Sequence, residues 1–210
     1  MVKALGEMLV VKVDAERYPK QVAEFGVEGV PAIVVVAPDG KTVISRIEAQ
    51  AMMQPETLLP KLAVAAPDAL FLSASCPEPK PEAIVAKADA RDADQVWQDD
   101  CIEFFVEPVK GSGEERHFAV SAGGMLYDSR NNDKAWNGDW TATAKRTPEG
   151  WAVEVRIPWA TLGLAGQPKP GVEMGFNTGR VRNAEGERSQ WSLTEGSSHQ
   201  PMRFGTLKAE

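Results

Sequence analysis

One stretch decides the fold: Val96-Trp97-Gln98-Asp99-Asp100-Cys101-Ile102-Glu103-Phe104-Phe105-Val106-Glu107-Pro108. We interpret it as a β-strand with a tryptophan and an acidic pair at its entrance. Side chains alternate along a strand, so Ile102, Phe104 and Val106 share one face and Glu103 lies on the other. Pro108 ends the strand because proline has no N–H to donate to a neighbouring strand. The strand pattern alone does not require the tryptophan or the acidic pair, so we expect a ligand there.

The rest of the chain divides into two parts of different pattern. From residue 66 onward, short alternating runs are separated by turn signals about every 8–12 residues, which is typical of a β-sandwich or barrel. Residues 1–65 combine strand runs and helical segments in the order strand, helix, strand, strand, helix. The run from Leu62 to Ala65 either ends the last helix or forms a short strand. We predict an α+β chain overall, with a domain boundary near residue 66 and a further strand over Ala83 to Ala88.

The composition limits the classes of partner. The chain has a net charge of −7 and a pI of about 5.0, so we expect no nucleic-acid groove and no anionic membrane surface as partner. No apolar run approaches the roughly 18 residues of a transmembrane helix, and the start lacks the apolar region of a signal peptide. Cys76 and Cys101 are too far apart for a CxxC motif. They either pair or are two buried thiols, and we favour buried thiols.

The first part of the chain contains a recognisable segment, Val27-Glu28-Gly29-Val30-Pro31-Ala32-Ile33. With Lys12-Val13-Asp14 before it and Pro38-Asp39-Gly40 after it, the segment resembles the C-terminal half of a thioredoxin fold. The resemblance implies a partial βαββα unit over residues 1–65. The redox CxxC of that family precedes the matching region and is absent here, so disulfide exchange is not expected.

The second part carries several spaced phrases that resemble a family 9 carbohydrate-binding module of the DOMON-like β-sandwich group. They are Leu70-Phe71-Leu72, Trp97 to Phe105, Gly150 to Trp159, Gly175-Phe176-Asn177, Gln190-Trp191-Ser192 and Arg203-Phe204-Gly205-Thr206-Leu207. The resemblance covers about residues 66–210 and lacks the first strands usual in the family. It implies an antiparallel β-sandwich that holds a sugar between aromatic faces, with polar side chains binding the hydroxyls.

The resemblance also implies a site. Trp97 matches the first aromatic platform, and Glu103 matches a carboxylate that binds hydroxyls. Three matching positions depart from the family: Ala119 stands for a sugar-contacting arginine, Gly179 for a glutamine, and the region of Ser198 for the second tryptophan. We therefore expect a site with one aromatic wall.

We predict that this carbohydrate site contains Trp97 and Glu103, joined by Arg180 or Arg182 and by His199. The competing interpretations are structural. Glu103 can be a half-buried carboxylate paired with an arginine, and the two arginines can form a solvated or ion-paired strand face. His117 is expected on a strand surface.

Other conspicuous residues have structural interpretations that we favour. The acidic pair Asp99 and Asp100 can cap a turn or hold calcium, and capping is preferred. Three tryptophans, Trp151, Trp159 and Trp191, are expected in the core, whereas Trp136 and Trp140 are equally consistent with rim packing or ligand contact. Two histidines are too few for a zinc cluster.

The function we predict is non-catalytic carbohydrate binding, to a plant-type polysaccharide or to oligosaccharide ends, as an accessory module of a glycoside hydrolase system. No paired carboxylates, nucleophile elbow, phosphate loop or HExxH motif indicates an enzyme, and no cofactor is expected. Two alternatives remain open: a redox-inactive thioredoxin-like scaffold, and a DOMON-like binder of haem or another small ligand through His117 or His199 and a methionine. The family resemblance implies an extracellular or periplasmic protein.

Overall fold

The computed structural model describes residues 9–10, 33–36, 43–47 and 62–209, and the chain forms two compact units, Met1–Glu56 with Glu210 and Thr57–Ala209. In the first unit, an antiparallel sheet has the order β1 (Leu9–Val10), β2 (Ile33–Val36), β3 (Val43–Ile47). The three strands fall within the runs that the sequence pattern predicts as strands, Leu9 to Val13, Ala32 to Val36 and Thr42 to Ile47. The helices and the turn of the thioredoxin-like arrangement lie outside the described residues, so that resemblance stays a prediction.

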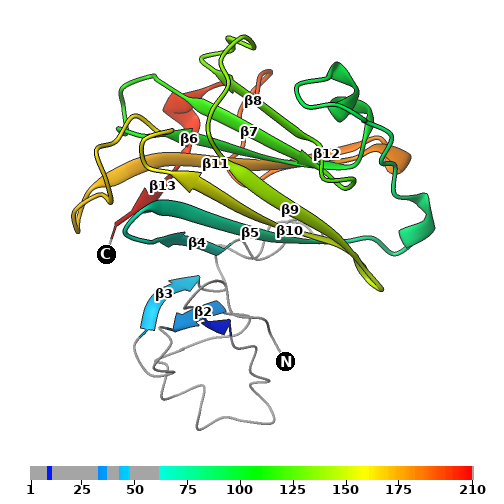
Figure 1. The fold of residues 1–210 in the computed structure, drawn as a ribbon, viewed down its shortest axis with the longest axis horizontal. Coiled ribbons are helices and arrows are strands. Elements are labelled where there is room, and N and C mark those ends of the chain that lie inside the picture. The colour runs from blue at the N-terminus through cyan, green and yellow to red at the C-terminus, as the bar shows by residue number, and fades with distance from the viewer. Residues whose placement is uncertain (1–8, 11–32, 37–42, 48–61, 210) are drawn as a thin grey trace, which may run out of the picture. The chain divides into compact units, whose positions relative to one another are not determined.

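The second unit is a β-sandwich of two antiparallel sheets (Figure 1). One sheet has four strands in the order β4 (Leu62–Ala65), β5 (Ala69–Pro77), β10 (Gly150–Pro158), β9 (Thr141–Thr147). The other has the order β12 (Glu187–Gln190), β11 (Glu173–Arg182), β6 (Cys101–Glu107), β7 (Arg116–Ser121), β8 (Leu126–Arg130), and β13 (Gly205–Lys208) also pairs with β11. The sandwich predicted for this part of the chain is confirmed.

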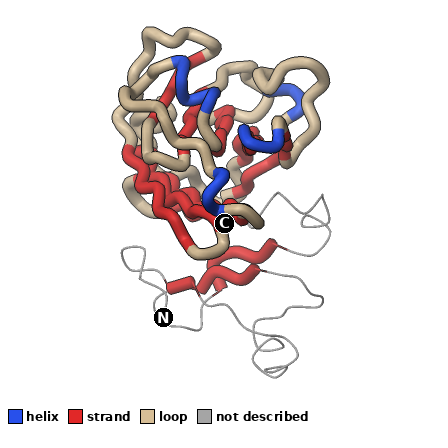
Figure 2. The backbone as a smooth tube through the Cα atoms, turned by 90° about the vertical axis from the view of Figure 1, so that its right-hand side faces the viewer, coloured by secondary structure: helices blue, strands red, loops and turns tan. Residues whose placement is uncertain are grey.

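The helical elements that the structure describes are four short 3-10 turns in the connections between strands (Figure 2). They are η1 (Pro81–Ala83), η2 (Asp94–Gln98), η3 (Asn183–Glu185) and η4 (Pro201–Arg203). Among the described residues, no helix has the length and apolar character needed to cross a membrane.

The core lies between the two sheets and follows the alternation of the strands. From β6 it takes Ile102, Phe104 and Val106, as the sequence predicted, and from β10 it takes Trp151 and three further apolar residues. Burial of one large apolar side chain stabilises a fold by about 1.5–3 kcal/mol. The tryptophans at 151, 159 and 140 are buried, and those at 136 and 191 pack against this core.

The hydrogen bonds of the backbone decide two local predictions, the one for residues 62–65 and the one for residues 83–88. Leu62–Ala65 forms strand β4, which pairs with β5, so the strand alternative is correct. The strand predicted from Ala83 to Ala88 is wrong, because this segment bonds to carboxylates instead of to a neighbouring strand. Asp99 accepts hydrogen bonds from the N–H groups of Lys87 (2.6 Å) and Ala88 (3.0 Å). Asp100 accepts one from Val85 (2.8 Å), so the acidic pair has the capping role that we preferred.

The two cysteines are separate buried thiols, as the sequence interpretation favoured. Cys76 belongs to the core between the sheets, whereas Cys101 alternates with Ile102 and lies on the outer face of β6. Burial raises the pKa of the Cys101 thiol well above its usual value. Because the thiolate is the reactive form, Cys101 is expected to be chemically inert.

Candidate functional site

The outer face of the six-stranded sheet, the face turned away from the core, carries one row of side chains across five strands. Strand pairing places these residues opposite one another in the order Gln190, Gly179, Glu103, Ala119, Tyr127. Glu103 therefore stands at the middle of the row, between the two smallest residues. No side chain from Gly179 or Ala119 reaches over the carboxylate.

One carboxylate oxygen of Glu103 is hydrogen-bonded to the protein, and the other has no hydrogen-bond partner among the described residues. Its side chain is 12% exposed, and Oε2 lies 3.0 Å from Nε2 of His117. An ionised carboxylate can only accept hydrogen bonds, so the imidazole Nε2–H is the donor. No described residue is hydrogen-bonded to Oε1. A methyl group in place of the Gly179 hydrogen would come within 3.5 Å of this oxygen, so glycine keeps that side of Glu103 open.

Trp97 lies beside Glu103, on η2 and not on the strand itself. Its half-buried ring stacks on the imidazole of His117, with centroids 5.5 Å apart and planes inclined by 18°. The ring meets Tyr127 edge-on at 4.8 Å and packs on the small cluster of Val96, Ala119 and Tyr127. A larger residue at position 119 would occupy the space of the indole. The aromatic surface and the carboxylate are thus neighbours, and both contact His117.

His117 is buried, and the prediction that it lies on a strand surface is wrong. Its exposed fraction is 2%, because Trp97 covers it on the outer face of the sheet. Its ring also stacks on Phe105 at 4.2 Å, with planes inclined by 8°. The second ring nitrogen, Nδ1, is buried and has no hydrogen-bond partner in the part of the chain that the structure describes.

His199 joins this group from a distant part of the sequence. Its ring meets His117 edge-on at 5.0 Å and Phe105 at 5.4 Å, and its Nδ1 bonds to a carboxylate oxygen of the buried Glu115. The neighbouring Ser198 accepts a hydrogen bond of 2.6 Å from the amide of Gln190. The structure therefore brings Trp97, Glu103 and His199 together around His117.

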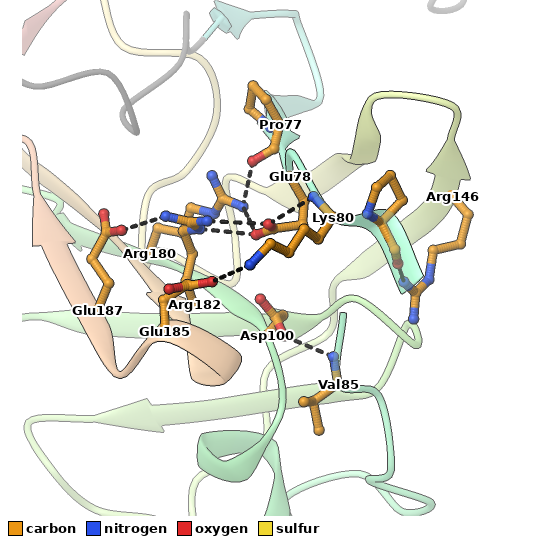
Figure 3. Close-up of polar contacts among 11 residues, drawn as sticks. Pro77, Glu78, Lys80, Val85, Asp100, Arg146, Arg180, Arg182, Glu185 and Glu187 are labelled. Carbon is orange, nitrogen blue, oxygen red and sulfur yellow. Dashed lines mark hydrogen bonds and ion pairs between the residues drawn. The ribbon is translucent and has the colours of Figure 1, made fainter. Parts of the chain in front are cut away.

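Arg180 does not join them. It stands opposite Ile102 in the β6–β11 register, so its side chain points into the sandwich. Its Nη2 donates to the carbonyl of Pro77 (2.8 Å), and Figure 3 shows Arg180 and Arg182 pointing toward Pro77 and Glu78. Arg182 binds both Glu78 oxygens, at 2.9 and 3.1 Å, and Glu187 at 2.5 Å. The ion-paired alternative for the two arginines is the one the structure shows.

The electrostatics of this inner cluster reflect the pairing of Glu78 with Arg182. The hydrogen bonds from Arg182 lower the pKa of the Glu78 carboxyl against the opposing effect of burial, and the same contacts raise the pKa of Arg182. Burial raises the pKa of the nearby Asp100 carboxyl. The carboxylate of Glu78 is fully engaged by Arg182 and Lys80, whereas Nε and Nη1 of Arg180 are buried without a hydrogen-bond partner among the described residues.

Sequence reasoning missed two side chains on the outer face. Gln190 ends the row that contains Glu103, and Arg188 lies two residues earlier on the same face of β12, opposite Val181. Arg188 is exposed and has no ion-pair or hydrogen-bond partner among the described residues. Alternation along β12 relates the two residues to each other, but only the pairing of β12 with β11 places them near Glu103.

Comparison with known proteins gives one match to a family. Residues 83–210, more than half of the chain, match the model of the family described as carbohydrate family 9 binding domain-like. A search of curated proteins found no significant match.

Solved structures share the fold. Two structures of a family 9 carbohydrate-binding module from Caldicellulosiruptor kristjanssonii, in complex with cellotriose and with glucose, each have a TM-score of 0.54 at 20% identity. The match covers 74% of this chain and 76% and 78% of the respective chains. A putative carbohydrate-binding protein from Bacteroides uniformis ATCC 8492 has a TM-score of 0.61 at 19% identity, over 96% of both chains.

Proposed function

Because the chain belongs to the carbohydrate family 9 binding domain-like family, we propose that it binds carbohydrate on the outer face of its six-stranded sheet. One observation carries the location of the site. Glu103 is a partly exposed carboxylate with one oxygen fixed by His117 and the other unbonded by any described residue, next to the ring of Trp97. A charged acceptor beside an aromatic surface is the pair of groups that a sugar needs.

The chemistry of a pyranose fits this pair. Its C–H groups form an apolar face that covers an indole ring, and its hydroxyls point outward in the plane of the ring. The apolar face of the sugar would stack on the ring of Trp97, and Oε1 of Glu103 would accept a hydrogen bond from a sugar hydroxyl. A hydrogen bond to a charged group contributes about 1.5–3 kcal/mol in proteins. Gln190 and Arg188 supply further donors at one end of the row.

The same geometry favours binding over catalysis. A glycosidase places two carboxyl groups on either side of the bond that it cleaves. Among the described residues, the carboxylate bonded to His199 is Glu115, which is 4% exposed. It is not free to act on a bound sugar. The haem alternative is disfavoured at His117, because its Nε2 is bonded to Glu103 and its ring is 2% exposed under Trp97.

The finer assignments rest on the family and on its neighbours. Structures of this fold hold cellotriose and glucose, which supports a β-glucan or its chain ends as ligand and a role beside a glycoside hydrolase. A binding module for such polymers belongs where they occur, which supports an extracellular or periplasmic location.

Calorimetric titration of the full chain with cellotriose, glucose and xylotriose tests the proposal. We expect binding of at least one sugar, weakened about tenfold or more, near 1.4 kcal/mol, by Trp97→Ala and by Glu103→Gln. Matched controls are Trp136→Ala, a half-buried tryptophan of a loop that packs against the core, and Glu154→Gln, an exposed glutamate of β10. Absence of heat with all three sugars, or equal losses in the controls, would contradict the proposed function.

A further inference from the structure

The chain contains two histidines, and both lie at the proposed sugar site. His199 reaches it from a distant part of the sequence, 84 residues after its partner Glu115. His117 is the more central of the two. It contacts the carboxylate of Glu103 through Nε2 and the rings of Trp97, Phe105 and Tyr127 through its own ring. It is 2% exposed, so a sugar on the sheet surface would meet the neighbours of His117 before it met His117.

The first of these contacts fixes the direction of a carboxylate. A glutamate on an open sheet rotates about its last torsion with little preference. The Nε2–H of His117 holds Oε2 at 3.0 Å, which leaves Oε1 as the oxygen on the side that Gly179 keeps open. The acceptor is therefore oriented before any ligand arrives, which reduces the entropy that binding costs.

The second contact supports the aromatic surface. Trp97 belongs to a five-residue 3-10 turn without a side-chain cap at its N-terminus, and its ring is held at one edge by Tyr127 and Ala119. The ring lies against the imidazole at 5.5 Å, and the imidazole in turn stacks on Phe105, which is fully buried in the sheet. His117 supports the stacked face of the indole, beside the edge contact that Tyr127 makes.

We infer that His117 is a positioning residue of the carbohydrate site, which couples the orientation of Glu103 to the support of Trp97 without touching the sugar. The inference rests on the proposed function. A histidine that only filled space would affect the stability of the fold. It would not make the effects of Trp97 and Glu103 on sugar affinity depend on each other.

A double-mutant cycle tests the coupling. His117→Phe keeps a ring against Trp97 and removes the donor to Glu103, whereas His117→Gln keeps an N–H near the position of Nε2 and removes the ring. In calorimetry with cellotriose we expect His117→Phe to weaken binding about tenfold, since a hydrogen bond to a charged group is lost. In a Glu103→Gln background the same substitution should weaken binding less than twofold further.

The control cycle pairs His117→Phe with Glu154→Gln, which lies on the other sheet, and its effects should multiply. His117→Gln should recover part of the affinity lost in His117→Phe. The inference is overturned if His117→Phe binds within twofold of the wild type, or if its effect multiplies with that of Glu103→Gln as it does with the control. Thermal unfolding of each variant ensures that folded protein is titrated.

A measurement on the wild-type chain covers the case in which the buried substitutions do not fold. Two histidines give a simple nitrogen-15 spectrum of the imidazoles, and His199→Gln assigns the signals. We expect cellotriose to shift the Nε2 signal of His117, and Glu103→Gln to shift it without sugar. If cellotriose moves the indole signal of Trp97 and leaves His117 unchanged, the inference fails and the proposed function stands. If cellotriose, glucose and xylotriose all fail to bind, both fail.

Discussion

The six-stranded sheet carries a cluster of charged residues on each face. Two consecutive residues of β11 lie one at each cluster. Gly179 faces outward beside Glu103, and Arg180 faces inward beside Glu78. Glu78 is 4% exposed, with both oxygens bound in the fork of Arg182 and one of them also accepting from the N–H of Lys80. Glu103 is 12% exposed and has one oxygen without a described partner.

The difference shows what makes a charged residue available to a ligand. Both carboxylates are hydrogen-bonded to a side chain of the six-stranded sheet, Glu78 to Arg182 and Glu103 to His117. The inner carboxylate has its hydrogen-bonding capacity used by protein, so it ties β5 to β11 across the sandwich. The outer carboxylate keeps unused capacity beside an aromatic ring. For these two carboxylates, unused hydrogen-bonding capacity on a partly exposed side chain, and not charge, separates the proposed binding site from the structural ion pair.

The largest expected effect is on the free energy of unfolding, and it comes from breaking the inner cluster. Glu78→Gln removes the charge that balances Arg180 and Arg182, and loss of one partner from a buried pair costs about 3–5 kcal/mol. Urea denaturation should show this loss in the free energy of unfolding, whereas sugar affinity of the folded variant should stay within twofold of the wild type. Glu103→Gln should show the reverse. A Glu78→Gln variant as stable as the wild type would contradict the comparison.

The same pair predicts a dependence on pH. Because the Arg182 contacts lower the pKa of Glu78 below its usual 4.5, the carboxylate contributes stability above pH 4.5 and loses it as the pH falls through the lowered value. Asp100 acts in the opposite direction, since burial raises its pKa above 3.8. Urea denaturation between pH 7 and 3 should therefore show a steeper loss in the wild type than in Glu78→Gln, in which that carboxyl is absent.

A smaller effect, on sugar affinity, is expected from a substitution that narrows the outer site. In Gly179→Ala the new methyl would lie 3.2 Å from the carbonyl of Ser189 and 3.5 Å from Oε1 of Glu103, so it crowds the oxygen that would receive a sugar hydroxyl. We expect cellotriose to bind roughly fivefold more weakly, about 1 kcal/mol. Gly123→Ala is the matched control, since its methyl would meet Ala86 at 3.3 Å away from this row. Equal affinity in the two variants would remove Gly179 from the site.

The smallest effect concerns the exposed end of the row. Arg188→Ala removes a cation that has no partner among the described residues, so stability should change by less than about 0.5 kcal/mol. We expect about a twofold loss of cellotriose affinity, because an exposed side chain gives up part of its gain to ordering. Arg156→Ala, on the other sheet, should leave affinity unchanged.

The fold could be predicted where local patterns carry the information. Alternation in β6 placed Ile102 and Phe104 on one face and Glu103 on the other, and the structure shows the first face in the core. The segment from residue 84 to 88 could not, because its partners are the side chains of Asp99 and Asp100 and not a neighbouring strand. Side-chain caps of this kind leave no periodic signal.

The sequence by itself determined the sandwich and the family, and it named three members of the proposed site, Trp97, Glu103 and His199. The tertiary structure decided which other residues accompany them. Every residue of β7 is buried, and so are Met174 to Val181 of β11, because one face meets the core while η2 and the segment after β12 cover parts of the other. A strand buried on both faces has no amphipathic pattern, so nothing local distinguishes the inward Arg180 from an outward residue, or the buried His117 from an exposed one.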